Sequence, residues 1–427
     1  MNQQNDNNDQ PVLPRRSRRL ATILPASHWI GLGYSEADAQ SMEELQNDMK
    51  KRSGDADIML RGSGEGAPLP YHDRILPHWK KLAKALKGRT NVEFLIAGIS
   101  LPILVLDVMF PALELAKITQ LVLSRTDLGN DELERLISFL GDNKSLRYLG
   151  IGEDLLNDIS IASSLSDSIQ NHPSLEGVGF SSCGLNSHDV FEKVLEGCAG
   201  LESLSCTFEE LGLDVTCISN FIGSNHPLER LTLKHCKITD SDVLQLTAAL
   251  KKNTNLEQLG LEDNDITAEG EKVLLKAMYD PTSMDSIVDS NHKCISYSYD
   301  IFNESILEQR LPLEIEVISI NLADVSIQWK IREKVILALC GMDGGLFDLS
   351  HFNDLPLGVM PSVLELIQKH FDARTRPYNE MQQKRDALSR LFYTLRGWEL
   401  PSLFVNLNAP SANITTGKRK RRKTRRY

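Results

Sequence analysis

Cysteine and histidine are the residue types in this chain that are best suited to nucleophilic, redox or metal chemistry. The 427 residues include seven cysteines and ten histidines, but no Cys-x-x-Cys pair and no paired Cys–His spacing typical of zinc sites. His172 and His226 each stand in Asn-His-Pro, which is typical of a turn. Cys183 and Cys236 occupy matching positions of separate segments, where a buried thiol packs as a small hydrophobic residue. We therefore expect no metal site, no disulfide framework and a reducing compartment.

Motifs of nucleotide-binding and hydrolytic sites are also missing. The sequence contains no GxxxxGK[ST] phosphate loop, no GxGxxG after a predicted strand, and no HExxH or GxSxG. We expect no catalytic residue and no cofactor, and we predict that the chain is not an enzyme.

The C-terminal tail carries the clearest short charge signal. Eight of the ten residues from Lys418 to Tyr427 are cations. Such a run is typical of a nuclear-import signal or of a nucleic-acid contact, and it also occurs as a solubilising end. We favour the import signal. The cations are Lys418, Arg419, Lys420, Arg421, Arg422, Lys423, Arg425 and Arg426.

The rest of the chain is acidic. The net charge of −11 becomes −11 − 8 = −19 without the tail, and residues 118–283 hold 27 acidic and 12 basic residues, a net charge of −15. An acidic surface disfavours nucleic acid and favours cationic partners. The N-terminus has no apolar core of a secretory signal, and no stretch is long and apolar enough to span a bilayer. We expect an intracellular protein without membrane contact, located in the nucleus or in both nucleus and cytoplasm.

These features flank an internal repeat of about 28 residues. Its clearest copies are LERLTLKHCKI at 228–238 and LEQLGLEDNDI at 256–266, and successive copies lie 27, 28, 29, 26, 27, 28 and 28 residues apart. The alternating L-x-L predicts a short strand with one buried face, and the remainder of each copy has helical periodicity. The polar or thiol side chain five residues after the central apolar anchor is expected to satisfy backbone groups where the strand turns away. The anchors are Phe94, Leu121, Leu149, Val178, Leu204, Leu231, Leu259 and Ile287.

Over residues 91–294 this pattern resembles the ribonuclease-inhibitor-like subfamily of leucine-rich repeats. The resemblance implies an α/β horseshoe solenoid, with short parallel strands inside and helices outside. The layout is also similar to repeat proteins with a helical extension after the solenoid.

We predict five segments from changes in composition and periodicity. Three C-terminal helices are expected at 324–340, 359–371 and 380–396. The segments are a disordered arm (1–70), an N-terminal capping helix (71–90), the solenoid (91–298), a helical C-terminal unit (299–405) and a disordered basic tail (406–427).

The concave strand face is the candidate binding surface. Its central lane consists of small residues apart from Val122, which leaves room for a helix or an extended segment of a partner. Side chains with the character of interface hot spots are few. The expected partner contacts are Tyr148, Glu153, Arg230, Lys234, Glu262 and Asp263.

Three functions fit these observations. We favour a non-catalytic scaffold or adaptor that binds a protein with a basic or helical segment. An activator of a Ran-like small GTPase is an alternative, because such activators share the repeat period, although their C-terminal tail is acidic. The third possibility is a nucleic-acid-associated protein that is held by its basic tail.

Overall fold

The computed structural model describes residues 22–52, 55, 57–62, 67–152, 158–181, 187–207, 215–297 and 312–339. The chain divides into two compact units. Unit 1 contains Met1–Val273 and Ser296–Asn303, and unit 2 contains Leu274–Ile295 and Glu304–Tyr427.

The repeats form one parallel sheet. Strand order follows the sequence from β1 to β9 in the described part of the chain, and the printed pairings from β1 to β8 are parallel. The anchor residues lie opposite one another in register from Phe94 to Leu259, each at most 1% exposed. This pairing confirms the predicted α/β solenoid. The strands are β1 (Asp57–Arg61), β2 (Glu93–Ala97), β3 (Gln120–Ser124), β4 (Tyr148–Gly152), β5 (Gly177–Ser181), β6 (Ser203–Thr207), β7 (Arg230–Lys234), β8 (Gln258–Gly260) and β9 (Ile295–Tyr297).

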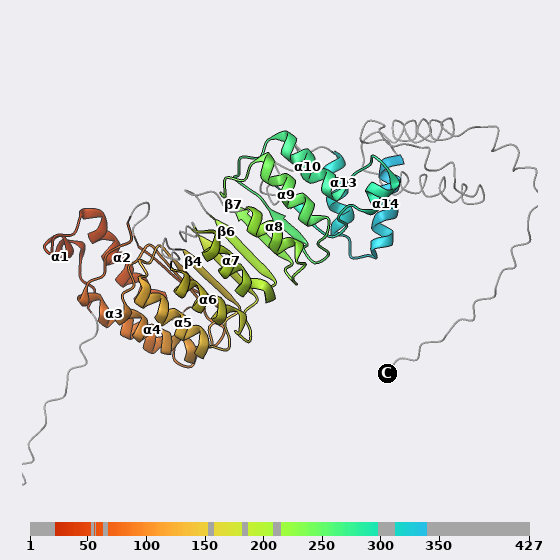
Figure 1. Cartoon of the computed structure of the whole chain (residues 1–427). Helices are drawn as coiled ribbons and strands as arrows, with labels where there is room; N and C mark the ends of the chain where they lie inside the picture. Colours follow the sequence, from red (N-terminus) through yellow and green to blue (C-terminus); the bar gives the residue numbers. More distant parts are fainter. Residues whose placement is uncertain are drawn as a thin grey trace, which may run out of the picture. The chain divides into compact units, whose positions relative to one another are not determined.

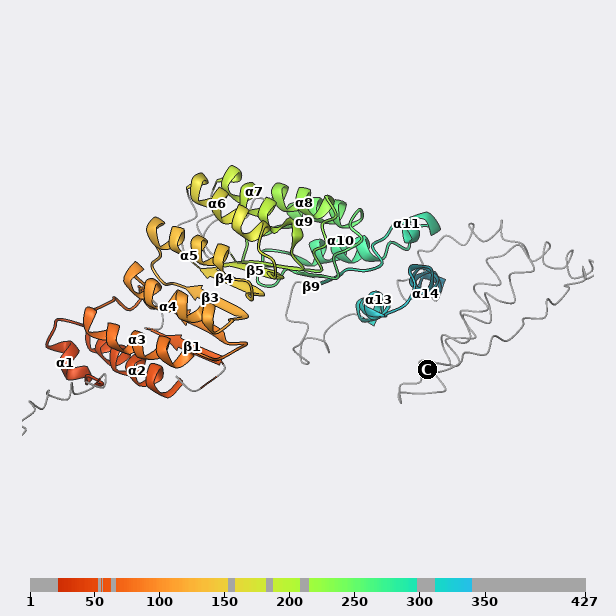
Figure 2. The ribbon, with the colours of Figure 1, turned by 90° about the horizontal axis from the view of Figure 1, so that it is seen from below.

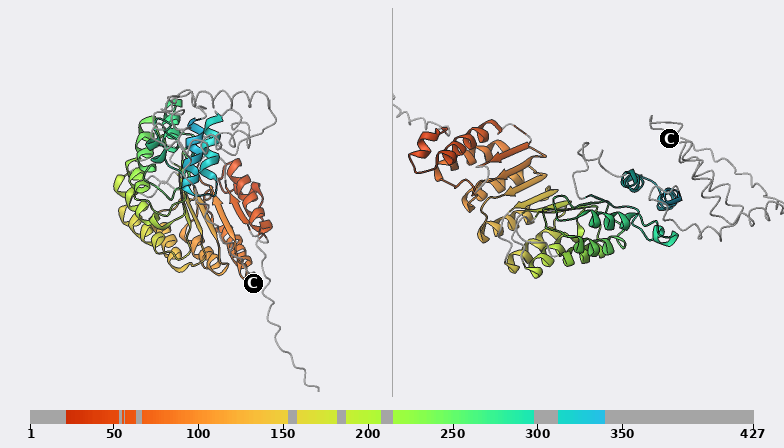
Figure 3. Two further views of the ribbon diagram at one scale, coloured as in Figure 1. Left: turned by 90° about the vertical axis from the view of Figure 1, so that its right-hand side faces the viewer. Right: turned by 90° about the horizontal axis from the view of Figure 1, so that it is seen from above.

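A helix follows almost every strand and covers the same face of the sheet (Figures 1 and 2). Within unit 1 the helices lie on the outside of a curve and the strands on its inside (Figure 3). A helix is wider than a strand, so stacking such repeats curves the layer toward the strands. The helices are α3 (Leu76–Leu86), α4 (Ile103–Leu115), α5 (Asn130–Asp142), α6 (Ile159–Gln170), α7 (His188–Gly197), α8 (Val215–Gly223), α9 (Asp240–Leu250) and α10 (Ala268–Met278).

A half-buried asparagine, Asn264, fixes the backbone where the strand turns toward the helix. Asn264, five residues after its anchor, accepts hydrogen bonds from the Cys236 and Ile238 amides at 2.8 and 3.1 Å and donates to the Leu233 carbonyl at 2.7 Å. The Cys236 thiol donates to the carbonyl of Cys206 at 3.4 Å. These contacts confirm the predicted role of that repeat position.

In two repeats an asparagine stands three residues before the apolar residue that leads into the strand, a feature that the repeat pattern did not predict. The Asn143 side chain accepts from the Ser145 and Leu146 amides, and the Asn253 side chain accepts from the Asn255 and Leu256 amides. These bonds hold the tight turn that delivers the chain into the next strand.

The predicted disordered arm over 1–70 is wrong for residues 22–52 and 57–62. Residues 1–21 lie outside the described residues, but helices α1 (Ala26–Ile30) and α2 (Glu36–Arg52) follow, and β1 pairs Ile58 with Phe94. Trp29 is fully buried and anchors this segment. Because β1 precedes it, α3 belongs to a complete repeat and is not the capping helix predicted over 71–90.

The predicted last repeat at 284–294 is also wrong. Ile287 lies in helix α11 (Met284–Val288), and the ninth strand begins only at Ile295. Ser283 caps α11 through a 3.0 Å bond from the Ser286 amide, and this polar cap favours a helix over a strand.

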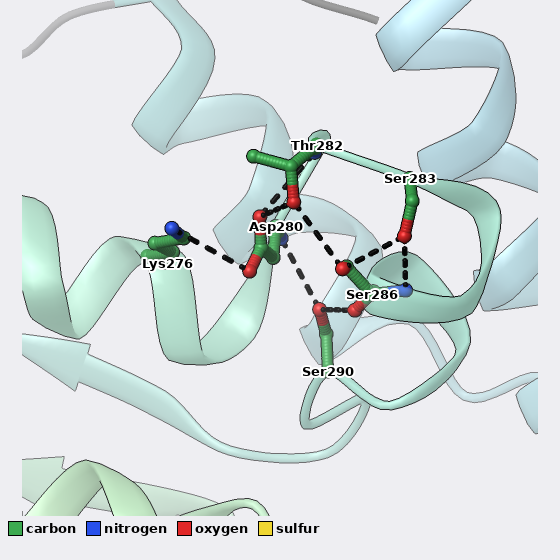
Figure 4. A network of polar contacts seen from close by, with 6 residues as sticks. All are labelled: Lys276, Asp280, Thr282, Ser283, Ser286 and Ser290. Atoms are coloured by element: carbon green, nitrogen blue, oxygen red, sulfur yellow. Dashed lines mark hydrogen bonds and ion pairs between the residues drawn. The ribbon is translucent and has the colours of Figure 1, made fainter. Parts of the chain in front are cut away.

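Hydroxyl groups hold the loop around α11 in a single network within unit 2 (Figure 4). The Asp280 carboxylate accepts from the Thr282 hydroxyl at 2.7 Å and lies 3.8 Å from Lys276. Ser290 joins the network by accepting from the Asp280 amide at 3.2 Å and donating to the Ser286 carbonyl at 2.8 Å.

Unit 2 also contains helices α13 (Pro312–Leu322) and α14 (Ile327–Leu339), of which α14 was predicted and α13 was not. The helices predicted at 359–371 and 380–396 lie outside the described residues. Lys334 of α14 is completely buried and donates to the carbonyls of Met278 and Asn291. Burial, with a further contribution from nearby Lys330, lowers the Lys334 pKa to about 7. Among the described residues, no helix combines the length and apolar character that a bilayer span requires.

Replacing Asn264 with Ala is expected to lower the free energy of unfolding by about 2 kcal/mol, because buried amides and carbonyls lose their partners. Asn47, which is exposed on α2, provides the matched control, and Asn47→Ala is expected to change the same quantity by less than about 0.5 kcal/mol. Urea denaturation of both variants measures the difference. Equal effects would show that the asparagine at the repeat position has no special structural role.

Lys334 is expected to make stability depend on pH above neutrality. Its folded pKa of about 7 lies below the ordinary value of 10.5, so between these values the unfolded chain binds more protons. The free energy of unfolding should therefore rise as pH increases through this window. Denaturation at several pH values should show that Lys334→Met removes this rise, whereas Lys272→Met, at an exposed position on α10, retains it. An unchanged pH slope in Lys334→Met would contradict the expectation.

Candidate protein-interaction face

The concave face is formed by the strand residues that alternate with the buried anchors. In-register pairing aligns them into lanes that run across the sheet from strand to strand. The central lane is Val122, Gly150, Gly179, Ser205, Thr232 and Gly260. Small side chains in this lane keep the middle of the face shallow, although Gly150, Gly179 and Gly260 are themselves buried.

Tyr148 is the aromatic residue that covers part of this face. A Cβ atom placed on Gly177 would lie 3.1 Å from the Tyr148 ring, and one placed on Gly179 would overlap the Tyr148 hydroxyl oxygen. The ring therefore extends from β4 across β5, over two glycines that leave room for it. Burial raises the Tyr148 pKa, with a smaller contribution from the nearby Cys206 thiol.

A cavity of about 270 Å³ opens beside Tyr148, at the edge where the strands begin. We call it the strand-start groove. Both Tyr148 and Arg230 line it, so the structure brings together two of the predicted contact residues. The full lining is Glu93, Thr119, Gln120, Arg147, Tyr148, Glu176, Gly177, Ser203 and Arg230.

Charged side chains surround the strand-start groove. Arg147 and Glu176 form an ion pair at 2.7 Å, and this contact raises the Arg147 pKa. Both side chains are well exposed, so the pair adds little to stability and remains accessible to a partner. Arg230 lies 3.9 Å from Glu229, its neighbour in sequence.

The other predicted contacts lie at the opposite ends of the strands. Lys234 approaches Asp263 at 3.1 Å and His235 approaches the same carboxylate at 3.3 Å. His235 and Asp263 both have positive φ, so tight turns bring them together. A five-residue strand separates this cluster from the strand-start groove by roughly 13 Å. The predicted residues thus form two groups.

Glu262 and Glu153 are the remaining predicted contacts on the concave face. Glu262 is partly buried beside this second cluster. Glu153 and the tail cations from Lys418 to Arg426 lie outside the described residues, so their roles stay predictions.

Sequence reasoning missed a row of charged residues at the strand-start edge. Each stands two residues before its anchor, and backbone bonds between successive members hold the row in register, such as the Glu229 amide to the Glu202 carbonyl at 2.9 Å. Aligning the repeats would have revealed the row, because its members all stand at the same position of the repeat. Its members are Arg147, Glu176, Glu202, Glu229 and Glu257.

The described residues contain no cluster of three or more His, Cys, Asp and Glu side chains with metal-binding geometry. The His172 ring accepts a hydrogen bond from the Ser174 amide at 3.3 Å, as expected of a turn residue. His226 packs its ring on Phe221 with the centroids 4.8 Å apart.

Comparison with known proteins agrees with this architecture. No family model matches the chain. The chain is 30% identical over 175 residues to mouse NACHT, LRR and PYD domains-containing protein 4C, which covers 39% of this chain and 17% of that protein. It is 27% identical over 155 residues to mouse NACHT, LRR and PYD domains-containing protein 5, covering 35% and 13% of the two chains. The repeats of this chain are thus similar to segments of proteins that are named for an LRR region, and they form an α/β solenoid of the leucine-rich-repeat type.

The chain spans less than one fifth of the length of these relatives, so the similarity concerns a part of them. A third relative, mouse NACHT, LRR and PYD domains-containing protein 4E, shows the same limit, with 29% identity over 171 residues and 17% of its length.

Gly179→Ala is expected to displace the Tyr148 ring, because the added methyl group would overlap the hydroxyl oxygen. Released from the buried site, the Tyr148 phenol should titrate closer to the ordinary pKa of 10.0. The tyrosinate absorbance difference between each protein and its Tyr148→Phe counterpart isolates this titration. Gly141→Ala is the control, because a methyl group there meets open space. An unchanged titration in Gly179→Ala would contradict this description of the face.

Proposed function

We propose that this leucine-rich-repeat chain is a non-catalytic scaffold or adaptor that binds a protein partner on its concave face. The observation that carries the proposal is the strand-start groove, where Tyr148 and Arg230 line one cavity beside a lane of small residues. Tyr and Arg are the side chains that most often dominate binding energy at protein interfaces. A shallow lane next to such residues suits an inserted helix or an extended segment.

The charge around the groove supports a partner with a basic segment. Glu202, Glu229 and Glu257 continue the row beyond the Arg147–Glu176 pair, on strands spaced about 4.8 Å apart. Cationic side chains of a partner would be steered toward this edge, mainly through a faster association rate. The proposal predicts binding that weakens moderately with salt.

The similarity to the relatives supports a role in protein interaction, and only their repeats contribute to this support. Their names include an LRR domain next to NACHT and PYD domains, and the aligned segments are a small part of each protein. The period near 28 residues and the full helix in each repeat support assignment to the ribonuclease-inhibitor-like subfamily. Fold alone does not define the partner.

In this proposal the basic tail directs the protein to the nucleus. Its eight cations favour nuclear import, and a contact with nucleic acid through the tail is the competing function. Activation of a Ran-like GTPase is a second competitor, which predicts that the chain stimulates GTP hydrolysis in catalytic amounts.

The decisive variant combines Tyr148→Ala with Arg230→Ala in the full-length chain. Loss of two hot-spot side chains is expected to reduce partner affinity at least about 30-fold, the change that corresponds to about 2 kcal/mol. Recovery of partners from native cells, followed by titration with the purified partner, measures the loss. Leu244→Ala with Lys272→Ala removes side chains of similar size from exposed helix positions, and this control should bind normally. Equal binding by the two double variants would overturn the concave-face proposal.

A chain that ends at Thr416 tests separately whether the tail determines cellular location and whether it binds the partner. Recovery of the same partners with a changed location supports the proposal. Loss of every partner together with the tail would show that the tail binds and that the repeats act as a spacer.

A further inference from the structure

A thiol–imidazole pair lies on the helical side of the sheet, away from the concave face. The Cys217 sulfur of α8 is 3.2 Å from Nδ1 and 3.7 Å from Nε2 of His188, the first residue of α7. The cysteine is 5% exposed, whereas half of the His188 side chain is exposed. The imidazole therefore connects a nearly buried sulfur with solvent. Helices α7 and α8 are neighbours in Figure 1.

The other described thiols have different surroundings. Cys236 and Cys294 donate hydrogen bonds to backbone carbonyls. A carbonyl accepts such a bond but is too weak a base to remove the proton from sulfur. Complete burial raises the Cys198 pKa to about 12, and Cys206 is equally buried. An imidazole, in contrast, can remove the proton from a thiol. Cys217 is therefore a thiol with an imidazole base in reach.

The position of Cys217 in its helix also favours the thiolate form. Cys217 is the third residue of the nine-residue helix α8. Amide groups in the first turn of a helix carry partial positive charge, which stabilises a thiolate. Glu192 of α7 lies 3.9 Å from His188 Nε2 and can stabilise the protonated imidazole.

Cys217 also lines a space large enough for a small reactant. A cavity of about 410 Å³ lies between α6, α7 and α8, and Cys217 is part of its wall. Leu195, Ala199 and Phe221 contribute apolar surface, whereas Gln170 and Asn220 contribute amides. The charged groups at this wall are Glu192 and the Lys193–Glu196 pair, which is closed at 2.7 Å. This lining suits a small uncharged molecule with one polar carbonyl group.

We propose that Cys217 is a covalent modification site for small α,β-unsaturated carbonyl compounds, with His188 as the proton acceptor. His188 takes the thiol proton, and the sulfur forms a bond to the β-carbon of the reactant. The π electrons of the carbon–carbon double bond move toward the carbonyl as an enolate. The α-carbon then receives the proton from the imidazolium, so the step needs no oxidant and releases no leaving group.

N-ethylmaleimide, a small compound of this class, tests the proposal on the full-length folded protein. Site-resolved mass spectrometry after brief exposure compares cysteines within the same sample. We expect Cys217 to react at least tenfold faster than Cys198, Cys206, Cys236 and Cys294. His188→Gln should slow the reaction of Cys217 at least about tenfold, because the thiol loses the imidazole that accepts its proton. His226→Gln removes the histidine that lines the cavity, whereas His188 is the one in contact with the Cys217 sulfur, so this variant should leave the rate unchanged.

The buried thiols report whether a variant remains folded. If His188→Gln unfolded the chain, Cys206 and Cys236 would react rapidly as well. The proposal would then be tested by the rate of Cys217 relative to the buried thiols in the wild-type protein. A Cys217 rate in the wild type within a factor of about three of the buried thiols would overturn the proposal. An unchanged Cys217 rate in a folded His188→Gln variant would overturn the role of the imidazole.

Discussion

In-register stacking of one apolar anchor on the next is the constraint on which the rest of unit 1 depends. Each anchor from Phe94 to Leu259 lies opposite its counterpart in the neighbouring strand, and each is almost completely buried. Burial of one such side chain contributes about 1.5–3 kcal/mol, which a single repeat cannot obtain alone. Because side chains alternate along a strand, the same register places every intervening residue on the concave face.

The concave face is therefore a consequence of the core. Gly177 and Gly179 are buried beneath the Tyr148 ring, and only residues without a side chain leave room for the ring there. In the same way, the glutamates two residues before the anchors from Val178 to Leu259 form a row because backbone hydrogen bonds between them keep them in register. The outer layer has its own chemistry, and the cavity beside Cys217 arises where neighbouring helices meet.

Much of this arrangement was predictable from the sequence, because the period near 28 residues predicts the anchors and the lanes. The N-terminal strand escaped prediction because Ile58 and Leu60 form only a short alternation between polar segments. The helix at Ile287 was mistaken for a strand because a short apolar run does not distinguish the two, and the deciding Ser283 cap is local. The pairing of Lys234 with Asp263 depends on residues with positive φ, which repeat spacing does not reveal.

Hydrogen–deuterium exchange of the full-length chain, with and without a recovered partner, tests the concave-face account most directly. The account predicts added protection in peptides that contain the starts of β4 to β7, around Tyr148 and Arg230, with unchanged exchange in α5 to α9. Protection confined to those helices, or to residues 417–427, would contradict it.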